Sequence, residues 1–143
     1  MNFKKIFMIQ RIQTIWLLLA SACAFLSMKF PFFAGADPLK NNGDFNATSG
    51  NIILLILTSM LGTLCLFTIF IFKQRKLQLW LTILALIISG VDIYLYFVYK
   101  KDYPNSTLAL ASIFAFLIPI FLFFATRGIY RDQKLVKSMD RLR

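Results

Sequence analysis

The residue best able to do chemistry in this sequence is Asp92, a carboxylate inside a long apolar run that ends near Tyr99. Ser89 lies three residues before it and Tyr96 four residues after it, so a helix would place all three on one face. A carboxylate inside a membrane is costly and therefore faces another helix or a cavity. It could be a proton or cation site, or a structural bond to a neighbouring helix, for example at Ser112. The structural role is favoured because the apolar runs supply no second carboxylate.

The second candidate site is the cationic segment at residues 127–143. Its apolar residues recur at helical spacing, which predicts a basic amphipathic helix joined to the preceding run through a flexible point at Gly128. Such a helix would bind anionic lipid headgroups or the surface of a partner protein. The cations are Arg127, Arg131, Lys134, Lys137, Arg141 and Arg143.

Enzyme signatures are absent from the sequence. It has no glycine-rich phosphate loop, no Ser/His/Asp set, no metal-ligand spacing and no histidine. Cys23 and Cys65 lie inside apolar runs, where they act as small hydrophobic residues and predict neither a disulfide nor a metal site. We therefore expect no catalytic residues, no cofactor and no metal.

The composition predicts a membrane protein. Hydrophobic residues make up 59% of the 143 positions and charged residues only 15%, against roughly 45–50% and about 25% in soluble domains. A chain this short cannot hide so much apolar surface in its own core, so lipid must cover the remainder. The net charge of +10 would suggest nucleic acid in a soluble protein. Here the cations flank the apolar runs, which indicates membrane topology and no nucleic-acid partner.

Four apolar runs of about 20 residues each are long enough to cross a bilayer. They occupy about residues 12–33, 52–72, 77–99 and 107–126. The runs do not alternate with period two, so helices are expected rather than a barrel. The first run is too long for the apolar part of a cleaved signal peptide. The predicted fold class is all-α: one integral membrane domain over residues 1–143, a four-helix bundle with a tail at 127–143.

The positive-inside rule orients this bundle. Twelve Lys and Arg residues fall on one side of the predicted membrane and four on the other. The first group comprises the six cations of the tail with Lys4, Lys5, Arg11, Lys73, Arg75 and Lys76, and the second comprises Lys29, Lys40, Lys100 and Lys101. Both termini are therefore expected in the cytoplasm.

The two ends of the chain resemble a family of uncharacterised four-span inner-membrane proteins from Bacteroidetes-type bacteria. The resemblance is carried by residues 8–20 (MIQRIQTIWLLLA) and 127–143 (RGIYRDQKLVKSMDRLR), with support from the loop at 72–78 (FKQRKLQ). It implies the bacterial inner membrane and four spans, and it implies no activity. Members of that family begin near the first motif, so translation could start at Met1 or at Met8.

These observations predict a non-catalytic accessory protein that stabilises or regulates a larger membrane assembly. Its expected partners are membrane lipids and other membrane proteins, and its oligomeric state is left open. The alternative is a small proton- or cation-coupled transporter that uses Asp92.

Overall fold

The computed structural model describes residues 3–34, 44–45, 51–72, 74–99, 101 and 107–140. Four long helices dominate these residues: α1 (Phe3–Lys29), α3 (Ile52–Phe70), α4 (Arg75–Tyr99) and α5 (Ser112–Asp140). Among the described residues, these four helices are long and apolar enough to cross a membrane. The expectation of an all-α bundle of four helices, each able to span a membrane, is therefore confirmed.

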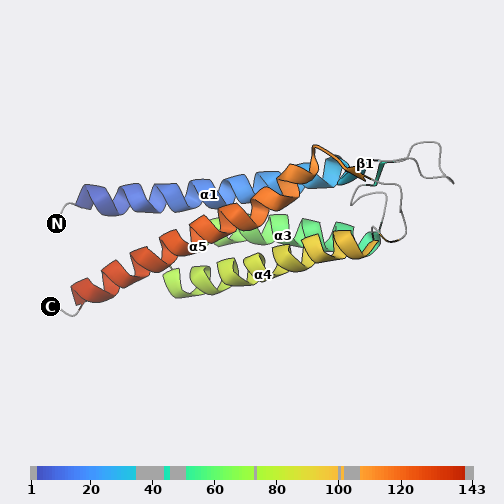
Figure 1. Cartoon of the computed structure of the whole chain (residues 1–143). Helices are drawn as coiled ribbons and strands as arrows, with labels where there is room; N and C mark the ends of the chain where they lie inside the picture. The colour runs from blue at the N-terminus through green and yellow to red at the C-terminus, as the bar shows by residue number, and fades with distance from the viewer. Residues whose placement is uncertain are drawn as a thin grey trace.

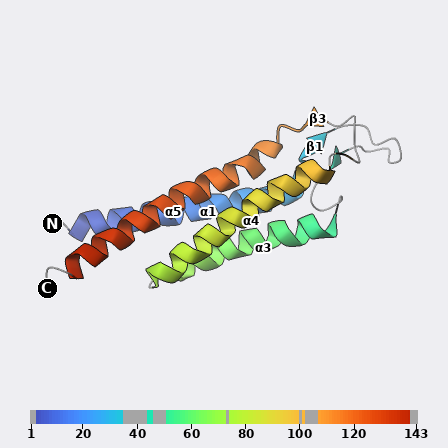
Figure 2. The same cartoon turned by 60° about the horizontal axis from the view of Figure 1, so that its bottom comes forward.

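The helices form a ring in which each one packs against two neighbours. α1 packs against α3 and α5, and α4 packs against the same two helices. Figures 1 and 2 show that chain direction alternates from α1 to α5, so every packed pair is antiparallel and both chain ends lie at one end of the bundle. Short connections favour such an up-down-up-down order, since consecutive helices are then neighbours.

Heptad spacing explains why the helices pack in this way. The buried residues of α4 follow one another at intervals of four and three, which places them on a narrow stripe. They are Gln78, Thr82, Ala85, Ser89, Asp92 and Tyr96. Stripes of this period produce left-handed packing with shallow crossing angles. The stripe is mostly polar or small while the lipid-facing side is apolar, which reverses the pattern of a soluble amphipathic helix.

Small residues bring the helices into close contact. Ala20 and Ala24 of α1 are fully buried. Gly62 of α3 lies under the ring of Phe25, where an added Cβ would come within 3.1 Å of the ring Cζ. The small pairs Ala20/Ala24 and Thr58/Gly62 are thus packing residues inside the bundle.

A three-stranded sheet of two-residue strands joins the connections at the end opposite the termini. β1 (Phe33–Ala34) lies between β2 (Asp44–Phe45) and β3 (Thr107–Leu108), and both pairings are antiparallel. This sheet shortens two expected spans, because α1 ends at Lys29 rather than near residue 33, and α5 starts at Ser112 rather than at 107. Phe32 then folds back and stacks on Tyr96, with ring centroids 4.1 Å apart.

The tail differs from its expected form. α5 is a single helix from Ser112 to Asp140, and it includes Pro119 within its length. The expected flexible point at Gly128 is therefore wrong, since the helix passes through it without interruption. Close packing is the physical reason: Gly128 faces Gln13 of α1, and a Cβ at that position would lie 2.9 Å from Cγ of Gln13. As far as it is described, the tail extends the last helix along the bundle.

Candidate functional site

The intramembrane carboxylate is held by the neighbouring helix α3. Asp92 is only 2% exposed. The hydroxyl of Thr58 lies 3.3 Å from Oδ1 of Asp92 and 2.7 Å from the carbonyl oxygen of Leu54, so one donor serves two acceptors. Asp92 thus contacts a neighbouring helix as expected, and the contact shown is with Thr58 of α3, whereas Ser112 of α5 was the example that the sequence suggested.

The two residues predicted to share a face with Asp92 are also buried. Ser89 is 2% exposed, but its hydroxyl donates to the carbonyl of Leu86 in its own helix, at 2.7 Å. Tyr96 is fully buried one turn beyond Asp92, where its ring stacks on Phe32. The sequence therefore predicted the shared face correctly. The geometry is that of a polar contact between α3 and α4 beside an aromatic cluster, in which Asp92 shares the Thr58 hydroxyl with the carbonyl of Leu54.

A second polar contact between α3 and α4 lies nearer the termini. The Nε2 amide of Gln78 donates to the carbonyl of Thr68, at 3.2 Å, and both side chains are buried. The Thr82 hydroxyl donates back to the carbonyl of Gln78, at 2.7 Å. Sequence reasoning missed these residues. The signal was present, because Gln78 and Thr82 extend the heptad spacing of Ser89 and Asp92.

A buried ion pair joins α4 to α5 at the end that carries both termini. Nη1 of Arg75 lies 3.0 Å from Oδ2 of Asp132, with the Arg75 side chain 24% exposed and the Asp132 side chain 4% exposed. Oδ1 of Asp132 has no hydrogen-bond partner among the described residues. Sequence reasoning missed this pair too. Asp132 continues the buried heptad stripe of α5 through Ala125 and Ile129, and that spacing could have revealed it.

Gln13 adds a third buried polar group to this end. It is 5% exposed, and its Nε2 lacks a hydrogen-bond partner among the described residues. Its side chain packs against Gly128, one helical turn before Asp132 on α5. Burial of an unpaired amide is unfavourable, so Gln13 is a polar group that the bundle tolerates rather than one that stabilises it.

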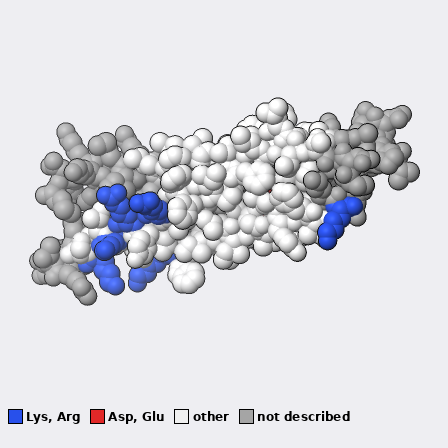
Figure 3. All heavy atoms as spheres, viewed as in Figure 1, with Lys and Arg blue, Asp and Glu red and all other residues white. Residues whose placement is uncertain are grey.

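The cations predicted as a binding surface are solvent-exposed as far as they are described. Arg127, Arg131, Lys134 and Lys137 are all exposed on α5, whereas Arg141 and Arg143 lie outside the described residues. Figure 3 shows Lys and Arg side chains gathered at the end that carries both termini, with a smaller group at the opposite end.

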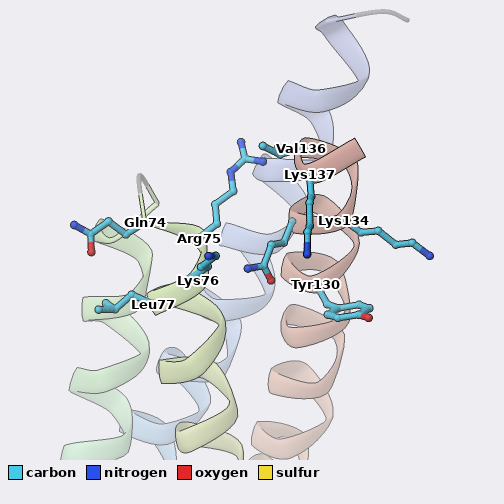
Figure 4. Close-up of a pocket in the computed structure, with 9 residues that line it drawn as sticks. Gln74, Arg75, Lys76, Leu77, Tyr130, Lys134, Val136 and Lys137 are labelled. Atoms are coloured by element: carbon cyan, nitrogen blue, oxygen red, sulfur yellow. The ribbon is translucent and has the colours of Figure 1, made fainter. Parts of the chain in front are cut away.

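Two of these cations line a groove between the start of α4 and the last turns of α5, which we call the basic groove. Its volume is about 940 Å³. Its lining residues are Gln74, Arg75, Lys76, Leu77, Tyr130, Gln133, Lys134, Val136 and Lys137. Figure 4 shows them contributed by the two helices on either side of the gap. Four of the nine are cations and none is a carboxylate, so the groove is suited to an anion.

Metal ligation finds no support in this arrangement. No three His, Cys, Asp or Glu side chains come together in the described parts of the chain in a way that could hold a metal ion. The groove supplies nitrogen cations and one phenol, which recognise phosphate or carboxylate groups through charge and hydrogen bonds.

A known family model matches most of the chain. The model of a domain of unknown function, DUF4293, matches residues 9–142 of the chain. The chain belongs to the DUF4293 family. The match includes α1 from residue 9 onward, all of α3, α4 and α5, and the basic groove, so these features lie within the family's domain. Neither a curated protein nor a solved structure matches the chain.

Proposed function

We propose that this protein is a non-catalytic accessory subunit that stabilises or regulates a larger assembly in the bacterial inner membrane. The proposal rests on two small polar residues on the lipid-facing side of α3, Ser59 and Thr63, which we call the polar step. Thr63 is exposed four residues after Ser59, and both hydroxyls donate to carbonyls of their own helix. Small residues at this spacing let a further transmembrane helix approach closely.

The depth of this step favours contact with another spanning helix. Thr58, the neighbour of Ser59, contacts Asp92 well inside the bundle. Gly90 of α4 lies close to that level and is exposed, with open space where a Cβ would be. Larger apolar side chains surround the step on α3, including Met60 and Phe67, which are 49% and 61% exposed. A partner helix could insert between them.

A site-specific cross-linking experiment tests the accessory role. A photoreactive amino acid at Thr63 is expected to capture a defined membrane protein in native membranes. The matched control is Ile120 of α5, a helix that is not a packing neighbour of α3, where the side chain is 47% exposed. Capture of lipid alone at Thr63, or of the same proteins at both positions, would contradict the proposal. Capture of only a second copy of the chain would indicate a homo-oligomer instead.

We also propose that both termini lie in the cytoplasm. Six of the eight cations with described side chains lie on the terminal end of the bundle, and only Lys29 and Lys101 lie at the other. This asymmetry supports the orientation that the positive-inside rule predicts. In a chain lacking Cys23 and Cys65, a membrane-impermeant maleimide should label Lys101→Cys in spheroplasts and leave Ser138→Cys unlabelled. The reverse labelling would overturn the orientation.

A further inference from the structure

The lining of the basic groove has four cations and no carboxylate. Arg75 is engaged by Asp132, and this is the ion pair found among the described residues. Lys76, Lys134 and Lys137 also line the groove, and none of them has a carboxylate within 4.0 Å in the described parts of the chain. Three lysines around one concave surface attract an anion.

Two of the lysines come from different helices. Lys76 lies in the first turn of α4 and Lys137 near the end of α5. In Figure 4, the Lys137 side chain runs along α5, whereas Lys134 points away from α4. The first turn of α4 also carries backbone amides that have no acceptor within the helix, and these add partial positive charge. An anion between Lys76 and Lys137 would thus bridge two helices.

Aromatic residues place the groove at the depth of lipid headgroups. Trp80 is 72% exposed and lies one turn along α4 from Lys76, about 6 Å further along the helix axis. Tyr130 lines the groove and is 61% exposed. Exposed Trp and Tyr side chains concentrate at the boundary between hydrocarbon and headgroups. The groove therefore opens where lipid phosphates lie.

Apolar surface continues from the groove towards the membrane interior. Leu77 lines the groove, and exposed apolar residues follow it along one face of α4 at intervals of three and four. These residues are Trp80, Leu84, Ile87 and Val91. A free phosphate ion would gain no binding energy from such an apolar surface, whereas the acyl chain of a phospholipid would cover it.

We propose that the basic groove binds the phosphate headgroup of an anionic phospholipid, with Lys76 and Lys137 on the phosphate and the acyl chain along Leu77 and Trp80. The proposal is independent of the accessory role, because it concerns lipid rather than a protein partner. The expected ligand is a phospholipid with a net negative headgroup, such as phosphatidylglycerol. The groove should not bind the zwitterionic phosphatidylcholine.

Fluorescence quenching by brominated lipid tests the proposal on the full chain. The chain has two tryptophans, so Trp16→Phe leaves Trp80 as the sole reporter beside the groove. The protein is reconstituted in phosphatidylcholine vesicles containing a small fraction of brominated phosphatidylglycerol or brominated phosphatidylcholine. We expect quenching at a lower fraction of brominated phosphatidylglycerol. Lys76→Gln/Lys137→Gln should lower that preference by about 25-fold, since each of the two cations near a membrane surface contributes on the order of a fivefold change.

Matched variants separate site binding from general charge. Lys29→Gln/Lys101→Gln removes the same charge at the opposite end and should leave the preference unchanged, and Lys76→Arg/Lys137→Arg should retain it. Equal quenching by both lipids, or an undiminished preference in Lys76→Gln/Lys137→Gln with native helical circular dichroism, would overturn the proposal. Displacement of phosphatidylglycerol by millimolar inorganic phosphate at constant ionic strength would assign the groove to free phosphate and also refute it.

Discussion

Removing one partner of the buried ion pair should destabilise the protein by different amounts, depending on which of the two residues is replaced. Arg75→Met leaves the Asp132 carboxylate, with a side chain only 4% exposed, without its counter-charge. Loss of one partner of a buried pair costs roughly 3–5 kcal/mol. Protonating a carboxyl group of ordinary pKa near 3.9 at pH 7 costs about 4 kcal/mol, which sets an upper limit. We therefore expect Arg75→Met to lower the free energy of unfolding by about 3 kcal/mol at pH 7.

Replacing the acidic partner should lower the free energy of unfolding much less. Asp132→Asn leaves Arg75, whose side chain is 24% exposed and long enough to reach water. We expect a loss of about 1 kcal/mol, which is typical of a pair with one accessible partner. The double variant Arg75→Met/Asp132→Leu should be close to wild type, because replacing both charges by apolar groups removes the desolvation cost.

Reversible unfolding in mixed detergent micelles measures these differences. Trp16 is a suitable probe, since its ring lies 5.7 Å from Phe121 and 5.2 Å from Phe124 of α5, between ring centroids. The defect of Arg75→Met should also shrink as the pH falls towards 5, because protonation of the stranded carboxyl group then favours the folded state. Equal losses for Arg75→Met and Asp132→Asn, or a defect that grows at low pH, would refute this reasoning.

Five further substitutions test the packing by the same unfolding assay. Gly128→Ala should cost about 1 kcal/mol by displacing the side chain of Gln13 on α1. Gly90→Ala, whose added Cβ meets nothing within 4 Å, should be neutral or stabilising. Equal effects of the two substitutions would contradict the close approach of α1 and α5 at Gly128. Phe32→Ala should cost about 3 kcal/mol because this ring is 2% exposed, and Phe30→Ala, at 45% exposed, less than about 1 kcal/mol. Asp92→Asn, which keeps an acceptor for Thr58, should change stability by less than about 1 kcal/mol, and a larger loss would show that the charge itself is needed.

The architecture of the bundle could be predicted because lipid imposes it. Backbone groups in hydrocarbon must bond within a helix, and each apolar run in the sequence is about as long as a bilayer is thick. The ends of the runs were less accurate. Residues 30–33 and 107–111 are as apolar as the spans, but two-residue strands draw Phe33 and Leu108 into a sheet. Composition alone cannot distinguish an apolar helix end from an apolar strand.

The polar contacts were predicted in part. The shared face of Ser89, Asp92 and Tyr96 follows from helical periodicity, which needs no knowledge of neighbours. The partner of Asp92 could not be predicted, because it depends on which helix packs beside α4. The same holds for Asp132, which in sequence is one acidic residue among many cations. Its burial follows from the ring order that puts α5 against α4.

The sequence by itself determined the number of spans, the helical class and the uneven distribution of charge, since these depend on local hydrophobicity and on the positions of Lys and Arg. Only the tertiary structure decided that α5 continues unbroken through Gly128 and that this glycine lies against Gln13 of α1, because the approach of two helices cannot be predicted from local propensity. It also decided that Lys76 and Lys137, which are 61 positions apart in the printed sequence, line one groove. Cations distant in sequence become one surface only when two helices pack side by side.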